Sequence, residues 1–346
     1  MAQIGLLLVA LTAAALSMLA QRVRWVWPLQ LSRLYFFAHL AFAAWIIAGA
    51  TVESELPSEY FGWVVWPLAW AFFYARLSWD ARTSLPVSGP LQSVLHVGGL
   101  WLMTAMIASE AALRLDFIAG SAWYHALWGA APAVALWLVI GYALRWPMRA
   151  APLAYAQVGA PGLAIFLLTW IVVTSVFIPG EVSPVPYLPL LNPLDIAALL
   201  ALAALARWHL TDQRVSWHQA VRTAIGVVAF IALNAAALRA VHFLADVPWT
   251  PEALAHSRIV QAVLSLLWTV TAMGLMVFAH RRAMRGWWLL GAGLLTLVVV
   301  KLFFVDSSAQ ETIERIVSFV GVGLLILLIG YLAPVPPSAV KTTSTA

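Results

Sequence analysis

Two long apolar runs in the last fifth of the sequence constrain the fold most strongly. They occupy Trp287–Val305 and Ile316–Leu332, and a charged segment containing Asp306, Glu311 and Arg315 joins them. Each run is long enough to cross a hydrocarbon core of about 30 Å at about 1.5 Å per residue. Because a bilayer offers no water to exposed backbone groups, such runs must form helices. The segment therefore predicts a transmembrane hairpin whose charged turn lies at one membrane face.

The same pattern recurs along the whole chain. Of the 346 residues, 63% are apolar and only 10% are charged, whereas soluble domains average about 25% charged residues. Lipid must therefore be the solvent for most of the surface, and we predict an all-α, polytopic transmembrane helix bundle. About eleven spans are expected: Gln3–Leu19, Leu34–Val52, Phe61–Trp79, Leu91–Leu113, Ala122–Leu144, Gly162–Phe177, Pro193–Trp208, Ala220–Leu244, Ile259–His280, Trp287–Val305 and Ile316–Leu332.

No soluble segment is long enough to fold alone, so we expect one transmembrane domain over residues 1–334. Residues 335–346 are rich in proline, threonine and serine, which predicts a short disordered tail. The sequence contains no cysteine, which excludes disulfides, thiolate metal sites and cysteine nucleophiles.

Basic residues predict the orientation of the helices. With eleven spans, most of them fall on one side of the membrane, and the positive-inside rule makes that side cytoplasmic. The N-terminus is then outside and the C-terminus inside. Only five basic residues fall outside, and they lie among most of the acidic residues and several histidines. These five are Arg114, Arg239, Arg258, Lys301 and Arg315.

The eighth and ninth predicted spans contain the best candidates for ligand binding. Asn234, Arg239 and His242 lie on one helix face about 140° wide. The next span opens with Arg258 and continues with a polar stripe that includes Gln261. Polar groups inside a span are costly in lipid, so they should face other helices or a wet cavity. Arginine and histidine side chains there suit a phosphate or carboxylate.

A structural interpretation of the same residues is also open. Arg239 and Arg258 would then pair with Asp246 and Glu252 in the intervening loop and only stabilise the helix ends. Lys301 has two corresponding interpretations. Its ammonium group either extends to the membrane interface or adds positive charge to the pocket of spans eight and nine.

A second candidate site lies at the fourth and fifth predicted spans. Glu110 and His125 form a pair that would serve as general acid and base in a group transfer. The alternative is a local ion pair between Glu110 and Arg114, which are four residues apart on one helix.

No established catalytic or metal-binding motif is present. The single acid-x-acid motif, Glu53-Ser-Glu55, is a weak metal signal, so we expect no metal site and no cofactor. Phosphate-binding loops, zinc-protease helices and serine elbows are missing. Basic residues are spread over loops without a basic run, so nucleic acid is not an expected partner.

One helix start is well defined by its sequence. The segment from Ile178 to Asp195 contains five prolines and cannot be a continuous helix. It ends at Asn192-Pro193, where asparagine caps a helix and proline suits the first helical position.

The C-terminal motifs resemble those of a known family. They are Lys301-Leu-Phe-Phe-Val-Asp306, Arg315-Ile-Val-Ser-Phe-Val-Gly-Val-Gly323 and Gly330-Tyr-Leu-Ala-Pro334, together with Gln261–Trp268, the Asn234–Arg239–His242 helix and Tyr187–Asp195. The chain resembles the bacterial membrane proteins grouped as domain of unknown function 2339. Residues 179–334 match well, and residues 1–178 match only in character. Members are usually longer, so the chain resembles their C-terminal part. The resemblance implies a multi-pass protein of the bacterial inner membrane, linked to the cell envelope.

Three functional hypotheses follow from these observations. The first is binding and translocation, or presentation, of an anionic, lipid-linked envelope substrate at the periplasmic face. Arg239, His242 and Arg258 would hold the anion, Asn234 and Gln261 would orient it, and Lys301 would add charge. The second is a membrane-embedded glycosyl or acyl transferase using Glu110 and His125. The third is a structural subunit of a membrane complex, so the expected partners are membrane lipids, a lipid-linked glycan or other anion, and further membrane subunits.

Overall fold

The computed structural model describes residues 2–80, 89–119, 121–142, 145–182, 186–211 and 218–301, with the isolated residues 320, 323, 324 and 327. Every regular element in these ranges is helical, as predicted. In chain order the helices are α1 Ala2–Val23, α2 Val26–Glu53, α3 Gly62–Asp80, α4 Gly89–Ala119, α5 Ser121–Tyr142, η1 Met148–Ala150, α6 Pro152–Ala154, η2 Tyr155–Gly159, α7 Ala160–Phe177, α8 Pro193–Thr211, α9 His218–Leu244, α10 Pro251–His256, α11 Arg258–Arg281 and α12 Arg285–Lys301. The chain divides into an N-terminal unit, Met1–Ala236, and a C-terminal unit, Ala237–Ala346.

Ten of the eleven predicted spans overlap helices of the described ranges, whereas residues 143–144 of the fifth span and 302–305 of the tenth lie outside those ranges. The eleventh, Ile316–Leu332, lies outside the described residues apart from isolated positions, and the predicted tail at 335–346 lies wholly outside them. Within the described ranges, eight helical segments are long and apolar enough to cross a membrane: α1, α2, α4, α5, Pro152–Phe177, α8, α9 and α11. The protein is therefore an all-α, multi-pass membrane protein.

Two helices that match predicted spans are not among these eight, α3 and α12. The 19 residues of α3 include Arg76 and Asp80, and its apolar character comes largely from aromatic residues. The described part of α12 has 17 residues, fewer than the roughly 20 that a crossing needs.

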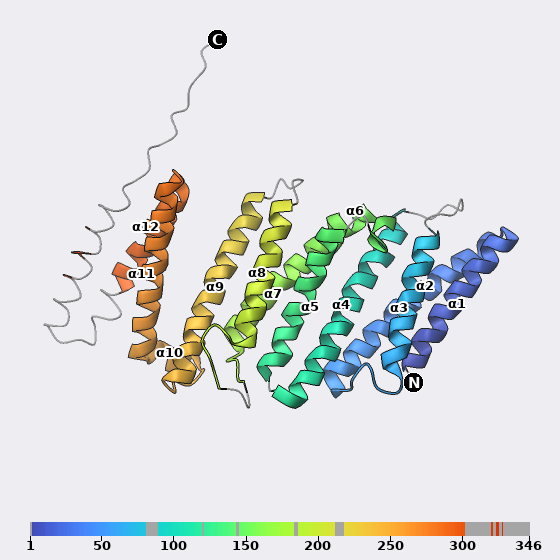
Figure 1. Cartoon of the computed structure of the whole chain (residues 1–346), viewed down its shortest axis with the longest axis horizontal. Helices are drawn as coiled ribbons and strands as arrows, with labels where there is room; N and C mark the ends of the chain where they lie inside the picture. Colours follow the sequence, from blue (N-terminus) through green and yellow to red (C-terminus); the bar gives the residue numbers. More distant parts are fainter. Residues whose placement is uncertain are drawn as a thin grey trace, which may run out of the picture. The chain divides into compact units, whose positions relative to one another are not determined.

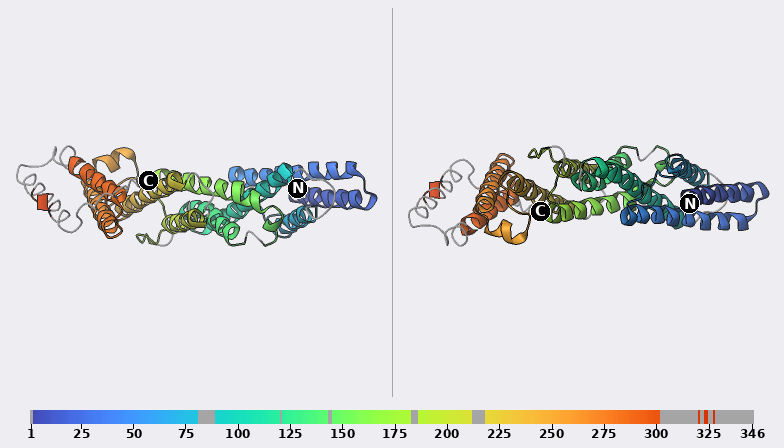
Figure 2. Two further views of the ribbon diagram at one scale, coloured as in Figure 1. Left: turned by 90° about the horizontal axis from the view of Figure 1, so that it is seen from above. Right: turned by 90° about the horizontal axis from the view of Figure 1, so that it is seen from below.

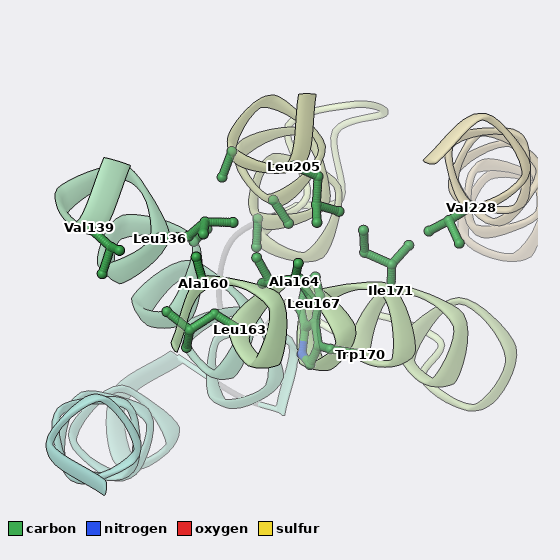
Figure 3. Close-up of a cluster of buried hydrophobic side chains, with 14 of the residues drawn as sticks. Leu136, Val139, Ala160, Leu163, Ala164, Leu167, Trp170, Ile171, Leu205 and Val228 are labelled. Atoms are coloured by element: carbon green, nitrogen blue, oxygen red, sulfur yellow. The ribbon is translucent and has the colours of Figure 1, made fainter. Parts of the chain in front are cut away.

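Neighbouring helices pack against one another in the N-terminal unit (Figures 1 and 2). α1 contacts α2 and α3, α2 contacts α4, α4 contacts α5, and α5 contacts both α7 and α8. Two apolar clusters hold them together. One is centred on Phe36, Phe73 and Met106 of α2, α3 and α4. The other, shown in Figure 3, gathers side chains such as Leu136 and Leu167 from α5 and α7.

Glycine allows one very close helix contact within the second cluster. A Cβ atom at Gly129 of α5 would lie 2.5 Å from ring atoms of Trp170 on α7. Small residues let membrane helices approach closely enough for extensive van der Waals contact. Trp170 also donates a hydrogen bond from Nε1 to the His125 carbonyl at 3.1 Å. These contacts lock α5 to α7.

The sixth predicted span begins earlier than the sequence indicated. The prediction began it at Gly162, directly after Pro161, whereas the helical path begins at Pro152 and passes through η2, a π-helical turn. Proline lacks an amide hydrogen and crowds the preceding turn of an α-helix. The wider π-turn immediately before Pro161 explains how the helix continues through this position.

The predicted start of α8 is confirmed. The Asn192 side chain accepts a hydrogen bond from the Leu194 amide at 2.9 Å, and Pro193 is the first helical residue. The Asn192 amide also donates to the Gly180 carbonyl at 2.8 Å, so this buried residue ties the proline-rich segment to the helix end.

The C-terminal unit contains the end of α9, then α10, α11 and α12. Thr250 caps α10 and Ser257 caps α11, each through its side-chain oxygen. α11 and α12 form an antiparallel pair around Ala272, Met276 and Leu295.

Candidate functional site

The ammonium group of Lys301 is held in the seam between α11 and α12. Its Nζ donates to the Ser265 Oγ at 2.7 Å and to the Gln261 carbonyl at 3.0 Å. Two interpretations were open for Lys301: extension of its ammonium group to the membrane interface, and positive charge added to the pocket of spans eight and nine. The contacts place its charge against the polar stripe of α11.

The stripe itself is preorganised by hydrogen bonds along α11. Ser265 donates to the Gln261 carbonyl at 2.9 Å, and Thr269 donates to the Ser265 carbonyl at 2.8 Å. The Gln261 side-chain amide donates to the Ala255 carbonyl at 2.9 Å, which ties the stripe to α10. One amide hydrogen of Gln261 is thus already committed within the protein, which limits how it could orient a ligand.

Among the described residues of the C-terminal unit, Arg239 is the most deeply buried cation. It lies on α9, a candidate membrane span, and only 2% of its surface is exposed. A charge taken out of water needs compensating interactions, and Arg239 is engaged by other groups of the protein. Buried guanidinium groups in membrane helices are generally retained for function. Arg239 and Lys301 therefore give the C-terminal unit two cations that are wholly or partly withdrawn from the surface.

His242 is fixed by the loop that follows α9. Its Nδ1 lies 2.6 Å from the Val247 carbonyl, and its ring packs edge-on against Trp249 and Phe243. Because a carbonyl can only accept, Nδ1 must bear a proton. Neutral His242 then has only a lone pair on Nε2, so it would donate to an anion only in its doubly protonated form.

Arg258 lies exposed in the first turn of α11, directly after the Ser257 cap. The structural alternative paired it with Asp246 or Glu252. No ion pair or side-chain hydrogen bond joins Arg258 to another residue in the described part of the chain, and both acids are exposed. Its guanidinium group is therefore accessible.

The boundary between the two compact units falls within α9, after Ala236. Asn234 therefore belongs to the N-terminal unit, whereas Arg239 on the same helix belongs to the C-terminal unit. Its side-chain amide donates to the Phe230 carbonyl of its own helix at 2.7 Å. This hydrogen bond satisfies one amide donor of Asn234 within its own helix.

Glu110 joins two segments of the N-terminal unit. Its carboxylate accepts from Arg114 Nε at 2.5 Å and from the Ser58 amide at 2.9 Å, and Arg114 Nη2 donates to Ser58 Oγ at 2.7 Å. The local Glu110–Arg114 pair expected as the structural alternative is thus present. Ser58 completes it, a partner that sequence spacing could not reveal across more than fifty residues. Within the described residues no hydrogen bond or ion pair joins the His125 ring to this network. The ring instead packs edge-on against Tyr124, with centroids 5.2 Å apart, and the His125 backbone carbonyl accepts a hydrogen bond from Trp170.

The acid-x-acid motif lines a cavity of about 420 Å³ at the end of α2. Glu53 and Glu55 share it with Trp45 and Tyr60. Within the described residues no three histidine, aspartate or glutamate side chains converge, so the cavity offers no metal-ligand set there.

Two fully buried histidines form part of the aromatic interior of the N-terminal unit. His39 packs against Trp70 and Phe73, with ring centroids 4.9 and 4.8 Å apart. His96 Nδ1 lies 3.0 Å from the Tyr155 hydroxyl. The isolated histidines of the sequence gave no signal for this arrangement, because the partners come from different helices.

These features define a class, the polytopic α-helical membrane proteins with buried polar groups between their helices. The chain belongs to the family described as "Predicted membrane protein (DUF2339)", whose model matches residues 1–336. The match therefore also includes residues 1–178, for which the sequence motifs gave only a general similarity. No curated protein and no solved structure matches the chain.

Proposed function

We propose that the C-terminal unit binds an anionic, lipid-linked substrate of the bacterial cell envelope at the periplasmic face of the inner membrane, for translocation or presentation. The proposal includes the orientation expected from the basic loops, with the N-terminus outside and the C-terminus cytoplasmic. Binding without covalent chemistry is favoured over transfer because the best-organised polar groups of this unit are cationic.

The observation that supports the proposal most is the position of the Lys301 ammonium group. It lies against Ser265 and Gln261 of α11 at hydrogen-bonding distance. An exposed lysine would keep its ammonium in water or among headgroups. Withdrawing it into a helix seam costs solvation, and that cost suggests a role for positive charge at this position.

Each residue has a distinct role in this proposal. Arg258, exposed at the start of α11, makes the first contact with a phosphate or carboxylate, because a guanidinium group binds such oxyanions through two donors. Arg239 and Lys301 supply a positive field from within the unit. Protonated His242 donates from Nε2, and Gln261 orients the ligand with its remaining amide hydrogen.

Binding of dodecyl phosphate to the purified protein in nanodiscs tests the proposal. Dodecyl phosphate combines an anionic head with a hydrocarbon chain, and dodecyl trimethylammonium serves as the cationic comparison. We expect saturable binding of the phosphate alone, abolished by Arg258→Ala and weakened by Lys301→Met.

Arg281→Ala provides the matched control, since Arg281 is exposed at the opposite end of α11. It should bind dodecyl phosphate as the wild type does. Unchanged binding by Arg258→Ala, or equal binding of both detergent head groups, would reject the proposal.

A further inference from the structure

A groove of about 330 Å³ runs between α4, α5 and α7. All three helices belong to segments that are long and apolar enough to cross a membrane. Among the residues that the structure describes, no charged side chain lines the groove. Its lining includes Trp101 and Thr104 of α4, Trp128 and Pro132 of α5, and Gly162 and Phe166 of α7.

The groove lies at the middle of all three spans. The candidate spans are Pro90–Asp116, Ser121–Tyr142 and Pro152–Phe177, and every lining residue falls close to the midpoint of its own span. The largest offset is about four residues, which corresponds to about 6 Å along a helix axis. Headgroups and water do not occupy this depth of a bilayer, so whatever fills the groove must be hydrocarbon or protein.

Two polar side chains in the walls of the groove, Trp101 and Thr104, are hydrogen-bonded within the protein. Trp101 Nε1 donates to the Gly159 carbonyl at the end of the π-turn at 3.1 Å. The indole packs so closely on Gly162 that a Cβ atom there would overlap the ring. The Thr104 hydroxyl donates to the Leu100 carbonyl at 2.7 Å. Neither side chain has a donor left for a polar ligand.

We propose that this groove binds the methyl-terminal part of one acyl chain of a membrane phospholipid. Its volume suits roughly ten methylene-sized groups, since a methylene is similar in size to a water molecule, which takes up about 30 Å³ in the liquid. A rigid, aromatic-walled groove orders such a chain by van der Waals contact, which the mobile chains around the protein do not gain. The site is independent of the anion site proposed for the C-terminal unit.

Photolabelling with two phospholipids tests the proposal. In one, a diazirine replaces the last methylene of an acyl chain. In the other, it lies next to the ester. In proteoliposomes the terminal probe should label the groove segments of α4 and α7 several-fold more than the segment around Leu199 of α8. Leu199 is 60% exposed and lies close to the middle of its own span, so it reports ordinary lipid contact at the same depth. The ester-proximal probe should show no such enrichment.

Two tryptophan variants of α4 provide a matched pair. Ala105→Trp fills the groove, whereas Ile107→Trp introduces the same side chain at an exposed position that does not line the groove. Enriched labelling should be lost in the first and kept in the second. Equal labelling of the groove and Leu199 would overturn the proposal, because it would mean either free lipid exchange or a groove filled by protein. If Ala105→Trp fails to fold, the proposal is tested instead by labelling the wild-type protein at increasing probe concentrations. Groove labelling must then saturate with increasing probe while Leu199 labelling rises in proportion.

Discussion

Lys301 Nζ on α12 donates to Ser265 Oγ on α11 at 2.7 Å, so one lysine joins the two main helices of the C-terminal unit. The same ammonium group also donates to the Gln261 carbonyl. The side chain of Gln261 in turn donates to the Ala255 carbonyl of α10. A single charge thus joins α12 to α11, at the residue whose side chain ties α11 to α10. It contributes to folding and, in the function proposed above, to the positive field that attracts an anion.

Ser265→Ala removes one acceptor of this ammonium group. We expect the unfolding free energy to fall by about 1 kcal/mol, the size of interhelical hydrogen bonds measured in membrane proteins. Thr296→Ala on α12 is the control, because that hydroxyl bonds only to its own helix and is exposed. Titration with a denaturing detergent would measure both variants. An equal loss in both would show that the contact between the helices contributes nothing of its own.

Glu110 provides a test that separates a structural role from an acid/base role. Glu110→Ala removes the acceptor of the buried Ser58 amide and should cost about 1–3 kcal/mol of stability. Glu110→Gln retains an oxygen that can accept that bond, so it should cost clearly less. The exposed Arg114 pairing adds little in either case. If Glu110→Gln were as stable as wild type yet abolished the cellular function, the acid/base hypothesis would gain support instead.

Replacement of Gly129 and of Gly226 by alanine should have opposite effects on stability. Gly129→Ala places a methyl group 2.5 Å from the Trp170 ring and should destabilise the N-terminal unit by about 1–3 kcal/mol. A Cβ at Gly226 meets nothing within 4 Å, so Gly226→Ala should be neutral or stabilising by up to about 1 kcal/mol through helix propensity. Thermal unfolding in detergent would check both. A neutral Gly129→Ala would mean that α5 and α7 separate easily.

Much of the fold could be predicted because lipid imposes simple rules on sequence. The length and apolar character of the runs were sufficient to predict ten helices. The Asn192-Pro193 pair was sufficient to predict where α8 begins. The sixth span was predicted to begin at Gly162, close to the start of α7 at Ala160, but the helical path already begins at Pro152. A π-turn, which depends on tertiary contacts such as Trp101 with Gly159, has no comparable sequence signature.

The candidate site was less predictable because its contacts join distant residues. Spacing along one helix was enough to propose the Glu110–Arg114 pair, but Ser58 comes from another segment. The polar stripe of α11 was evident from its spacing, whereas the contact of Lys301 with it depends on how α12 packs. The tautomer of His242 likewise follows only from the loop that returns to it.

Sidedness is the measurement that tests the proposed orientation and site most directly. Because the chain has no cysteine, single substitutions can be labelled in intact cells without background. Glu55→Cys, Glu252→Cys and Ala283→Cys lie in exposed turns or short helices between the long helices. We predict that an impermeant thiol reagent labels the first two from outside the cytoplasmic membrane and Ala283→Cys only after permeabilisation. Labelling of Ala283→Cys together with Glu55→Cys on one side would contradict the orientation and leave no periplasmic anion site.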